Sequence, residues 1–297
     1  MTITPDILCI GAVLWDIIGR SASHMSRGSD VPGRITRLPG GVAMNIAMAV
    51  QRFGMRPALI TAIGRDAEGD ELVTACLGMG MDMDHAYRSD DLPTDRYMAV
   101  EGGNGLIAAI ADAHSLEAAG ARILRPLRDG ALGKPGAPWR GRIALDGNLK
   151  VELLREIAAD PAFEAAQISI APASPGKAER LRVFLNHASA VFYVNLEEAG
   201  LLCKTKFPDS AAAAQALRDR GAARAVVTDG ANMASDAGHH GLISRLPPEV
   251  LVTRVTGAGD TFMAAHIAAE ATGTAPDVAM DRALTAAADY VSGDTAF

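Results

Sequence analysis

The feature that most constrains the fold is an alternation of short apolar runs and longer helical stretches in the second half of the chain. The apolar runs lie at residues 143–146, 167–171, 190–194 and 225–228. Stretches with helical periodicity lie between or after them, at 151–159, 178–187, 196–202 and 210–220. This rhythm is typical of a parallel sheet covered by helices on both faces. The sequence therefore predicts an α/β fold.

The first half of the chain adds further expected elements. Apolar runs at 7–13 and 58–64 predict buried strands, and residues 70–77 predict a helix. The runs 97–101 and 106–111 flank the Gly-Gly-Asn-Gly stretch at 102–105, which predicts a β-hairpin. Residues 17–38 are polar and poorly periodic, so they predict only short exposed strands. The Gly- and Pro-rich stretch at 128–140 predicts a surface loop.

Composition excludes several classes of function. The chain has 297 residues, which suits one large domain, and its net charge of -7 without a basic block argues against nucleic-acid binding. No apolar run approaches the ~20 residues that span a bilayer, and the N-terminus does not resemble a signal peptide. The separated cysteines Cys9, Cys76 and Cys203 indicate core thiols of a cytoplasmic protein. The pair His239-His240, flanked by glycines, indicates a solvated loop.

A glycine-rich turn near the C-terminus is the strongest candidate for chemistry. Thr256-Gly257-Ala258-Gly259-Asp260 lies between the apolar run 250–255, an expected strand, and the Ala-rich run 263–271, an expected helix. Small residues at a helix N-terminus let backbone N–H groups approach an anion. A carboxylate at that place suits a base that takes a proton from an attacking hydroxyl. The alternative is an Asp that caps the helix.

Two further features lie where a ligand would bind. Asp16 follows the first apolar run, and the carboxyl ends of parallel strands are where ligands bind in open α/β sheets. Gly40 and Gly41 form a second glycine turn, and Asn45 lies on the first turn of the helix that follows. The Asn45 amide can reach a bound ligand there, or it can make a local turn or cap bond.

In chain order, the Asp, the Gly-Gly turn with its Asn, the Asn195-x-x-Glu198 pair and the Gly-Ala-Gly-Asp turn resemble the PfkB/ribokinase family of sugar and nucleoside kinases. The resemblance extends from Ile10 to about residue 290. It implies a ribokinase-like three-layer fold, with a central, mostly parallel sheet flanked by helices. It also implies a single domain over 1–297, with a small β lid from segments of about 14–38 and 88–112.

The resemblance implies a role for each matching residue. Asp260 matches the catalytic base, and Gly257, Ala258 and Gly259 match the anion hole. The other matches are Asp16, Gly40, Gly41, Asn45 and Asp112 for the substrate, Asn195, Thr228, Gly230 and Thr256 for ATP, and Glu198 for Mg²⁺. In many members of the family the lid also forms the dimer contact, so a homodimer through the lid is expected.

Softer matches at 107–112, 145–149 and 174–181 are similar to the pseudouridine kinase branch of the family. They imply ATP-dependent phosphorylation of a nucleoside 5′-hydroxyl. A kinase for a free, ribose-like sugar or another nucleoside is an alternative, and a non-catalytic sugar- or nucleotide-binding protein is one of another class. Two residues depart from the family pattern. Arg254 stands where an Asp often helps bind K⁺, so a K⁺ requirement is left open, and Met233 replaces a glycine of the nucleotide turn.

Overall fold

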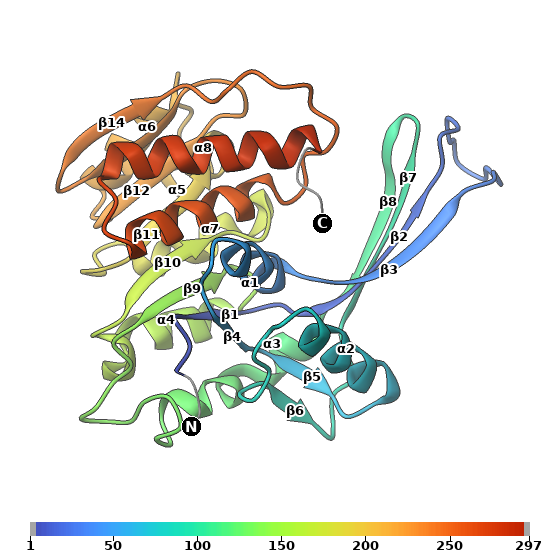
Figure 1. Ribbon diagram of the computed structural model, residues 1–297, viewed down its shortest axis with the longest axis horizontal. Helices are drawn as coiled ribbons and strands as arrows, with labels where there is room; N and C mark the ends of the chain where they lie inside the picture. The colour runs from blue at the N-terminus through green and yellow to red at the C-terminus, as the bar shows by residue number, and fades with distance from the viewer. Residues whose placement is uncertain (1–3, 294–297) are drawn as a thin grey trace.

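An eight-stranded sheet runs through the protein (Figure 1), whose structure is a computed structural model that describes residues 4–293. The strand order is β14-β13-β12-β11-β10-β9-β1-β4. The strands are β1 (Ile7–Ile10), β4 (Pro57–Ile60), β9 (Arg142–Asp146), β10 (Gln167–Ala171), β11 (Val191–Asn195), β12 (Arg224–Thr228), β13 (Ala234–Gly238) and β14 (Gly241–Arg245). Pairing is parallel from β4 to β12, and β13 and β14 add an antiparallel edge. The predicted α/β fold is confirmed.

Helices cover both faces of this sheet. One face carries α1 (Val42–Arg52), α2 (Ala67–Gly78), α7 (Ala258–Ala271) and α8 (Pro276–Ser292), and the other carries α3 (Ser115–Ala119), η1 (Gly120–Leu127), α4 (Val151–Ala159), η2 (Pro161–Phe163), η3 (Pro175–Phe184), α5 (Leu196–Cys203) and α6 (Ser210–Asp219). Strand β1, which lies between β9 and β4, shows why. Ile7 and Cys9 pack against the face covered by α1, α2, α7 and α8, and Leu8 and Ile10 pack against the opposite face. Successive strand residues point to opposite faces, so a fully apolar strand needs cover on both.

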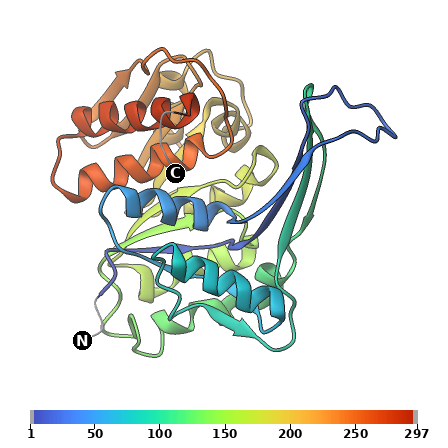
Figure 2. The same ribbon diagram turned by 45° about the vertical axis from the view of Figure 1, so that its right-hand side comes forward.

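A second, four-stranded sheet projects from the body of the molecule (Figures 1 and 2). Its order is β3 (Arg34–Gly40), β2 (Leu14–Arg20), β7 (Arg96–Gly102) and β8 (Gly105–Asp112). The predicted hairpin at 97–111 is confirmed as β7 and β8. The two ends of the stretch 17–38 lie in β2 and β3, each of seven residues and longer than the short strands expected. The apolar and polar residues of these strands do not alternate regularly, because this sheet is exposed along much of its length. The sequence therefore did not reveal how long the strands are.

Three sequence-based expectations for elements were wrong. The run 58–64 forms two strands, because the chain leaves the large sheet after Ile60, and β5 (Ala62–Gly64) pairs with β6 (Tyr87–Ser89) instead. Residues 88 and 89 therefore lie in this small sheet and not in the four-stranded one. The expected helix at 178–187 is the 3₁₀ segment η3, which begins at Pro175. By contrast, the loop predicted at His239-His240 is present, as the tight turn of the β13–β14 hairpin.

The apolar run 250–255 was also predicted wrongly, since it forms no strand. Leu251, Val252 and Val255 are 82%, 58% and 70% exposed, and β14 closes the edge of the sheet without pairing to them. The run has β-branched residues but no neighbouring strand to pair with, and local preference alone does not make a strand. Within residues 4–293, no helix is long and apolar enough to cross a membrane.

Candidate active site

Asp260 lies in the first turn of α7 and faces the N-terminal turn of α1. Its Oδ2 accepts a hydrogen bond of 3.1 Å from Nδ2 of Asn45, a residue 215 positions away in the chain. Burial raises the pKa of Asp260 to about 7; the Asn45 bond acts in the opposite direction, and the charges of Asp146 and Glu198 raise the pKa further. A carboxyl group with a pKa near neutral pH is well matched to general base catalysis. The two glycine turns found in the sequence thus meet in space.

The turn before Asp260 presents backbone N–H groups. Gly257 is the N-cap of α7, with φ 91° and ψ -4°, a conformation that residues with a side chain rarely adopt. The Ala258 N–H donates to Val255 O at 3.1 Å, so it is already engaged. Within residues 4–293, the N–H groups of Gly257, Gly259 and Asp260 have no acceptor. The expected anion hole therefore has two of its three predicted members free, with Asp260 as a further donor.

On the α1 side, Asp16 lies in β2 directly against the Gly turn. A Cβ atom at Gly40 would lie 1.9 Å from Asp16 Oδ2, so only glycine lets the carboxylate approach the backbone this closely. Gly41 is the N-cap of α1. Burial raises the pKa of Asp16 to about 6. The structure brings Asp16, Gly40, Gly41 and Asn45 together, as the sequence predicted for a site that holds hydroxyl groups.

Asp112 is the exception among the predicted substrate residues. In the register of the four-stranded sheet, Asp16 pairs with Tyr97, and Tyr97 pairs with Ala111. Asp112 pairs with Arg96 instead, so its side chain lies on the opposite face of the sheet from Asp16. Its carboxylate is 3.7 Å from Arg96 Nε. We therefore leave Asp112 out of the candidate site.

A cavity of about 490 Å³ opens beside Asp260 on the other side. It is lined by the predicted ATP and metal residues Asn195, Glu198, Thr228 and Gly230, together with Ala258, Gly259 and Asp260. None of the described residues that line it is Lys or Arg. In the expected nucleotide turn that begins at Gly230, only Gly230 has a positive φ. Met233 does not, so its backbone does not require a glycine. The lining of this cavity therefore offers phosphate groups backbone N–H donors but no cationic side chain.

Asn195 and Glu198 form a capping box at the start of α5. Asn195 Oδ1 accepts from the Glu198 N–H at 2.8 Å, and Glu198 Oε2 accepts from the Asn195 N–H at 2.9 Å. Burial raises the pKa of Glu198. The box uses one carboxylate oxygen, so the other remains for a metal ion or its water. Mg²⁺ is usually held by one or two carboxylates plus water and phosphate oxygens, so this donor set fits it without a larger cluster.

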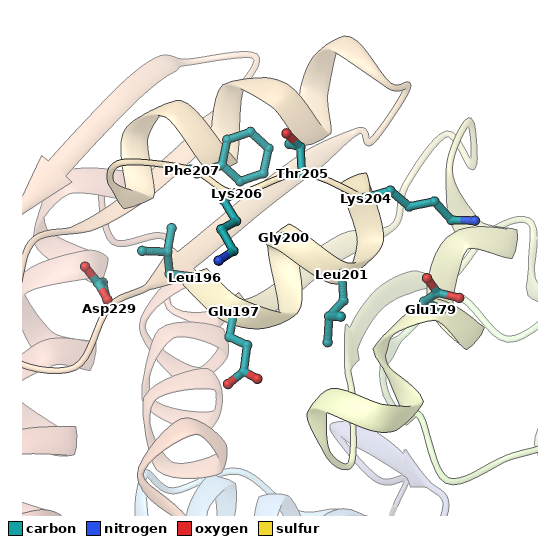
Figure 3. A pocket seen from close by; sticks show the side chains of 10 residues that line it. All are labelled: Glu179, Leu196, Glu197, Gly200, Leu201, Lys204, Thr205, Lys206, Phe207 and Asp229. Carbon is teal, nitrogen blue, oxygen red and sulfur yellow. The ribbon is translucent and has the colours of Figure 1, made fainter.

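A second, larger hollow of about 730 Å³ adjoins this cavity (Figure 3). The two share Leu196, Glu197 and Asp229, but the larger one contains none of the predicted catalytic residues. Figure 3 shows it along the outer side of α5, with Lys206 directed toward the helix and Phe207 beside it. Its size alone does not make it the reaction site, because the base and the free N–H groups lie elsewhere.

The sequence carried no signal for Tyr290, which the structure places at the turn formed by residues 256–260 (the anion turn). Its Oη donates to Thr256 O at 2.8 Å, and the Arg254 guanidinium lies over its ring. Arg254 therefore points toward α8. Only a contact between distant segments reveals this pair, since Tyr290 belongs to no motif of the sequence.

Comparisons with known proteins agree with this geometry. The pattern described as pfkB family carbohydrate kinase matches residues 4–293. The chain belongs to the PfkB family. Pseudouridine kinase from Escherichia coli is 27% identical to this PfkB protein over 265 residues, which cover 87% of this chain and 81% of the relative. A carbohydrate kinase from Agrobacterium tumefaciens has a TM-score of 0.80 and 25% identity, covering 98% of this chain and 91% of the other.

Arabidopsis thaliana ribokinase, solved with ribose and ATP, has a TM-score of 0.75 at 19% identity and covers 99% of this chain and 95% of the other. The PfkB protein therefore has the ribokinase-like fold predicted from its sequence, and it is a phosphotransferase that acts on a hydroxyl group.

Proposed function

We propose that the protein transfers the γ-phosphoryl group of ATP to the 5′-hydroxyl of a nucleoside, converting pseudouridine to pseudouridine 5′-phosphate. The observation that carries the reaction type is the meeting of Asp260 with Asn45 beside the free N–H groups of Gly257 and Gly259. A base and an anion site are then adjacent, as in-line transfer requires. A protein that only binds sugars or nucleotides would gain nothing from a carboxylate whose pKa is raised to about 7 there.

The reaction follows from the placement of these groups. The Asp260 carboxylate accepts the proton of the acceptor hydroxyl while the hydroxyl oxygen bonds to the γ-phosphorus. The bond from the γ-phosphorus to the oxygen that bridges it to the β-phosphorus breaks, and ADP leaves with that electron pair. The N–H groups of Gly257 and Gly259 donate to the oxygens of the transferred group. Asp16 and Asn45 hold the sugar hydroxyls, since a carboxylate and an amide accept from vicinal hydroxyls.

Thr228, Gly230, Asn195 and Thr256 would contact ATP, and Glu198 would hold Mg²⁺. When bound, Mg²⁺ neutralises phosphate charge in a cavity that has no cationic side chain of its own. Glu198 is rigid enough for this task because the capping box fixes its carboxylate. Nothing in this arrangement assigns a role to K⁺.

A polar cluster next to the acceptor site supports a nucleoside over a free sugar. Lys177 Nζ donates to Asn148 Oδ1 at 2.6 Å, and Asn148 Nδ2 donates to Asp146 Oδ2 at 3.0 Å. The same Asp146 oxygen accepts from the Ala12 N–H at 2.8 Å, and Ala12 O lies 3.4 Å from the Met44 N–H, beside Asn45. The edge of a uracil-type base carries C=O and N–H groups, which a Lys and an Asn amide can match. We assign Asn148 and Lys177 to the base.

A substrate screen with ATP and Mg²⁺, run with and without K⁺, tests the proposal. We expect the highest kcat/KM with pseudouridine, followed by uridine, with adenosine and ribose lower. Substitution of Asn148 or Lys177 by Ala should lower kcat/KM for pseudouridine by about 10- to 100-fold, since each removes roughly 1–3 kcal/mol of hydrogen bonding, and should spare ribose. The matched control is Lys150→Ala, at an exposed position beside the same loop. Faster turnover of ribose than of any nucleoside would identify a sugar kinase instead.

We further propose that residues 1–297 form one domain, that the four-stranded sheet closes over the acceptor as a lid, and that two lids meet in a homodimer. The face of this sheet opposite Asp16 carries Ile35, Met98, Val100 and Ile110, which are 77%, 43%, 36% and 61% exposed. Contiguous exposed apolar side chains mark a protein contact more often than an isolated one does. The buried free thiols of Cys9, Cys76 and Cys203 support the cytoplasm as the location.

A further inference from the structure

The segment that leads into the anion turn is fastened to the C-terminal end of α8. The N–H groups of Thr253 and Arg254 donate to Val291 O at 2.8 and 3.2 Å, and Arg254 Nε donates to Tyr290 O at 2.7 Å. These carbonyls belong to the last turn of α8, where a helix leaves its C=O groups without helical partners. A cation at this end also interacts favourably with the helix dipole. A helix end thus holds the segment that the sequence predicted as a strand.

Tyr290 reaches back from this helix end to the turn itself. Its Oη donates to Thr256 O at 2.8 Å. Its ring lies under the Arg254 guanidinium, whose Cζ is 3.9 Å from the ring centroid. Arg254 therefore contacts both the carbonyl and the ring of the same residue, which restricts the rotation of the Tyr290 side chain. The phenol becomes a fixed hydrogen-bond donor to the turn.

The bond to Thr256 O sets the direction of the next N–H group. A trans peptide is planar, and its C=O and N–H groups point in opposite directions. No peptide bond in residues 4–293 is cis. Because Tyr290 holds Thr256 O on the α8 side, the Gly257 N–H points away from α8. Tyr290 also lies so close that a Cβ atom at Gly257 would be 2.5 Å from its Oη, which explains the glycine at this position.

We propose that Tyr290, held in place by Arg254, is a positioning residue for phosphoryl transfer. Its hydroxyl fixes the Thr256–Gly257 peptide so that the Gly257 N–H is aimed at the phosphoryl group before the reaction begins. The inference rests on the proposed kinase function, since it deepens the role of the same turn. Donors that are already oriented stabilise the transition state without reorganisation. The effect therefore belongs to kcat and not to the binding of either substrate.

Kinetics of Tyr290→Phe test this inference. We expect kcat to fall about tenfold, as for loss of one well-placed hydrogen bond, with KM for ATP and pseudouridine unchanged within about twofold. Arg254→Lys should lower kcat by about threefold, and the double variant should be no slower than Tyr290→Phe, because both residues act through one peptide. Tyr87→Phe is the matched control. Its hydroxyl bonds Arg122 at 3.0 Å and that arginine lies over its ring, but the pair is remote from the turn.

Hydrogen exchange provides a second test that needs no substrate. The amides of Ala258 and Thr261, which donate to Val255 O and Gly257 O at the turn, should exchange faster in Tyr290→Phe than in the wild type or in Tyr87→Phe, while amides in the middle of α8 keep their protection. Unchanged exchange at the turn, or a Tyr290→Phe enzyme that works at the wild-type rate, overturns the inference. If the wild type phosphorylates no acceptor, the proposed function fails, and the exchange experiment still decides whether Tyr290 orders the turn.

Discussion

At the scale of single residues, Asp260 combines catalytic use with a structural cost. We expect Asp260→Asn to lower kcat by about 10²- to 10⁴-fold, the usual contribution of a general base, with little change in KM. The pKa of this carboxyl group is 3.8 for the isolated group and about 7 in the fold, because burial disfavours its charge. Its deprotonation therefore costs stability as the pH rises through that window.

The same variant should be more stable than the wild type at pH 8, by about 1 kcal/mol or roughly 2–4 °C in Tm, and this gain should vanish near pH 4. Thermal unfolding at both pH values measures it. The matched control is Asp84→Asn, at an exposed position, which should change neither kcat nor Tm. An Asp260→Asn enzyme that keeps its rate would remove Asp260 from the mechanism.

The rate of the wild type should depend on pH for the same reason. A base must be deprotonated to accept a proton, so kcat/KM should rise about tenfold per pH unit below 7 and level off above it, with an apparent pKa near 7. Asp16, with a pKa raised to about 6, adds to the loss at the acid end. A pH–rate profile in buffers of constant ionic strength checks this. A profile that is flat from pH 6 to 8 would contradict the assignment of the base.

At the scale of elements, α5 joins a helix cap to a metal ligand. In Glu198→Gln the amide oxygen can still accept from the Asn195 N–H, so the helix should keep its cap while the ligand loses its charge. We expect about tenfold more Mg²⁺ to be needed for half-maximal activity, with Tm unchanged or slightly raised because burial disfavours the Glu198 charge. Titration of activity with MgCl₂ at constant ATP measures this.

Glu152→Gln provides the control for this experiment, since Glu152 lies in the first turn of α4, away from the cavity. It should show the wild-type Mg²⁺ dependence. An unchanged dependence in Glu198→Gln would mean that Glu198 only caps α5.

The elements also show what sequence could and could not provide. Strands β9 to β12 were predicted well, because each is a short apolar run buried on both faces and bounded by polar residues. The run 250–255 has a similar local composition, but no strand lies beside it. A local pattern does not reveal whether a segment will find a strand to pair with. The site residues on glycine turns could be predicted for a similar reason: close backbone approach forces a residue type, as at Gly40 against Asp16.

Other parts of the site depend on contacts that no motif encodes. Tyr290 acts on Thr256 from a different helix, and the position of Asp112 depends on which face of β8 it occupies. In an exposed strand such as β8, alternation does not reveal the face, because every residue of the strand is exposed. The resemblance to the family therefore gave the residue types of the site, and the three-dimensional pairing decided which of them meet.

At the scale of the whole molecule, the projecting sheet predicts the oligomeric state. Ile35 and Val100 both pair with Gly19, which has no side chain, so their apolar groups flank a shallow gap on the face opposite Asp16. Ala108 extends the row on the far strand. If two such faces pack together in a homodimer, a charge in the middle of the contact should disrupt it, since an unpaired buried charge costs several kcal/mol.

We expect the wild type to behave as a dimer in sedimentation equilibrium and the Ile35→Asp and Val100→Asp variants to behave as monomers. Val278→Asp, on α8, is the matched control, because Val278 is an equally apolar and 41% exposed residue outside the sheet. The monomers should also show a higher KM for the acceptor, because a lid without its partner closes less readily over the substrate. The change in kcat should be smaller, because Asp260 and the anion turn stay in place. A wild type that sediments as a monomer, or aspartate variants that remain dimeric, would show that the apolar face serves another purpose.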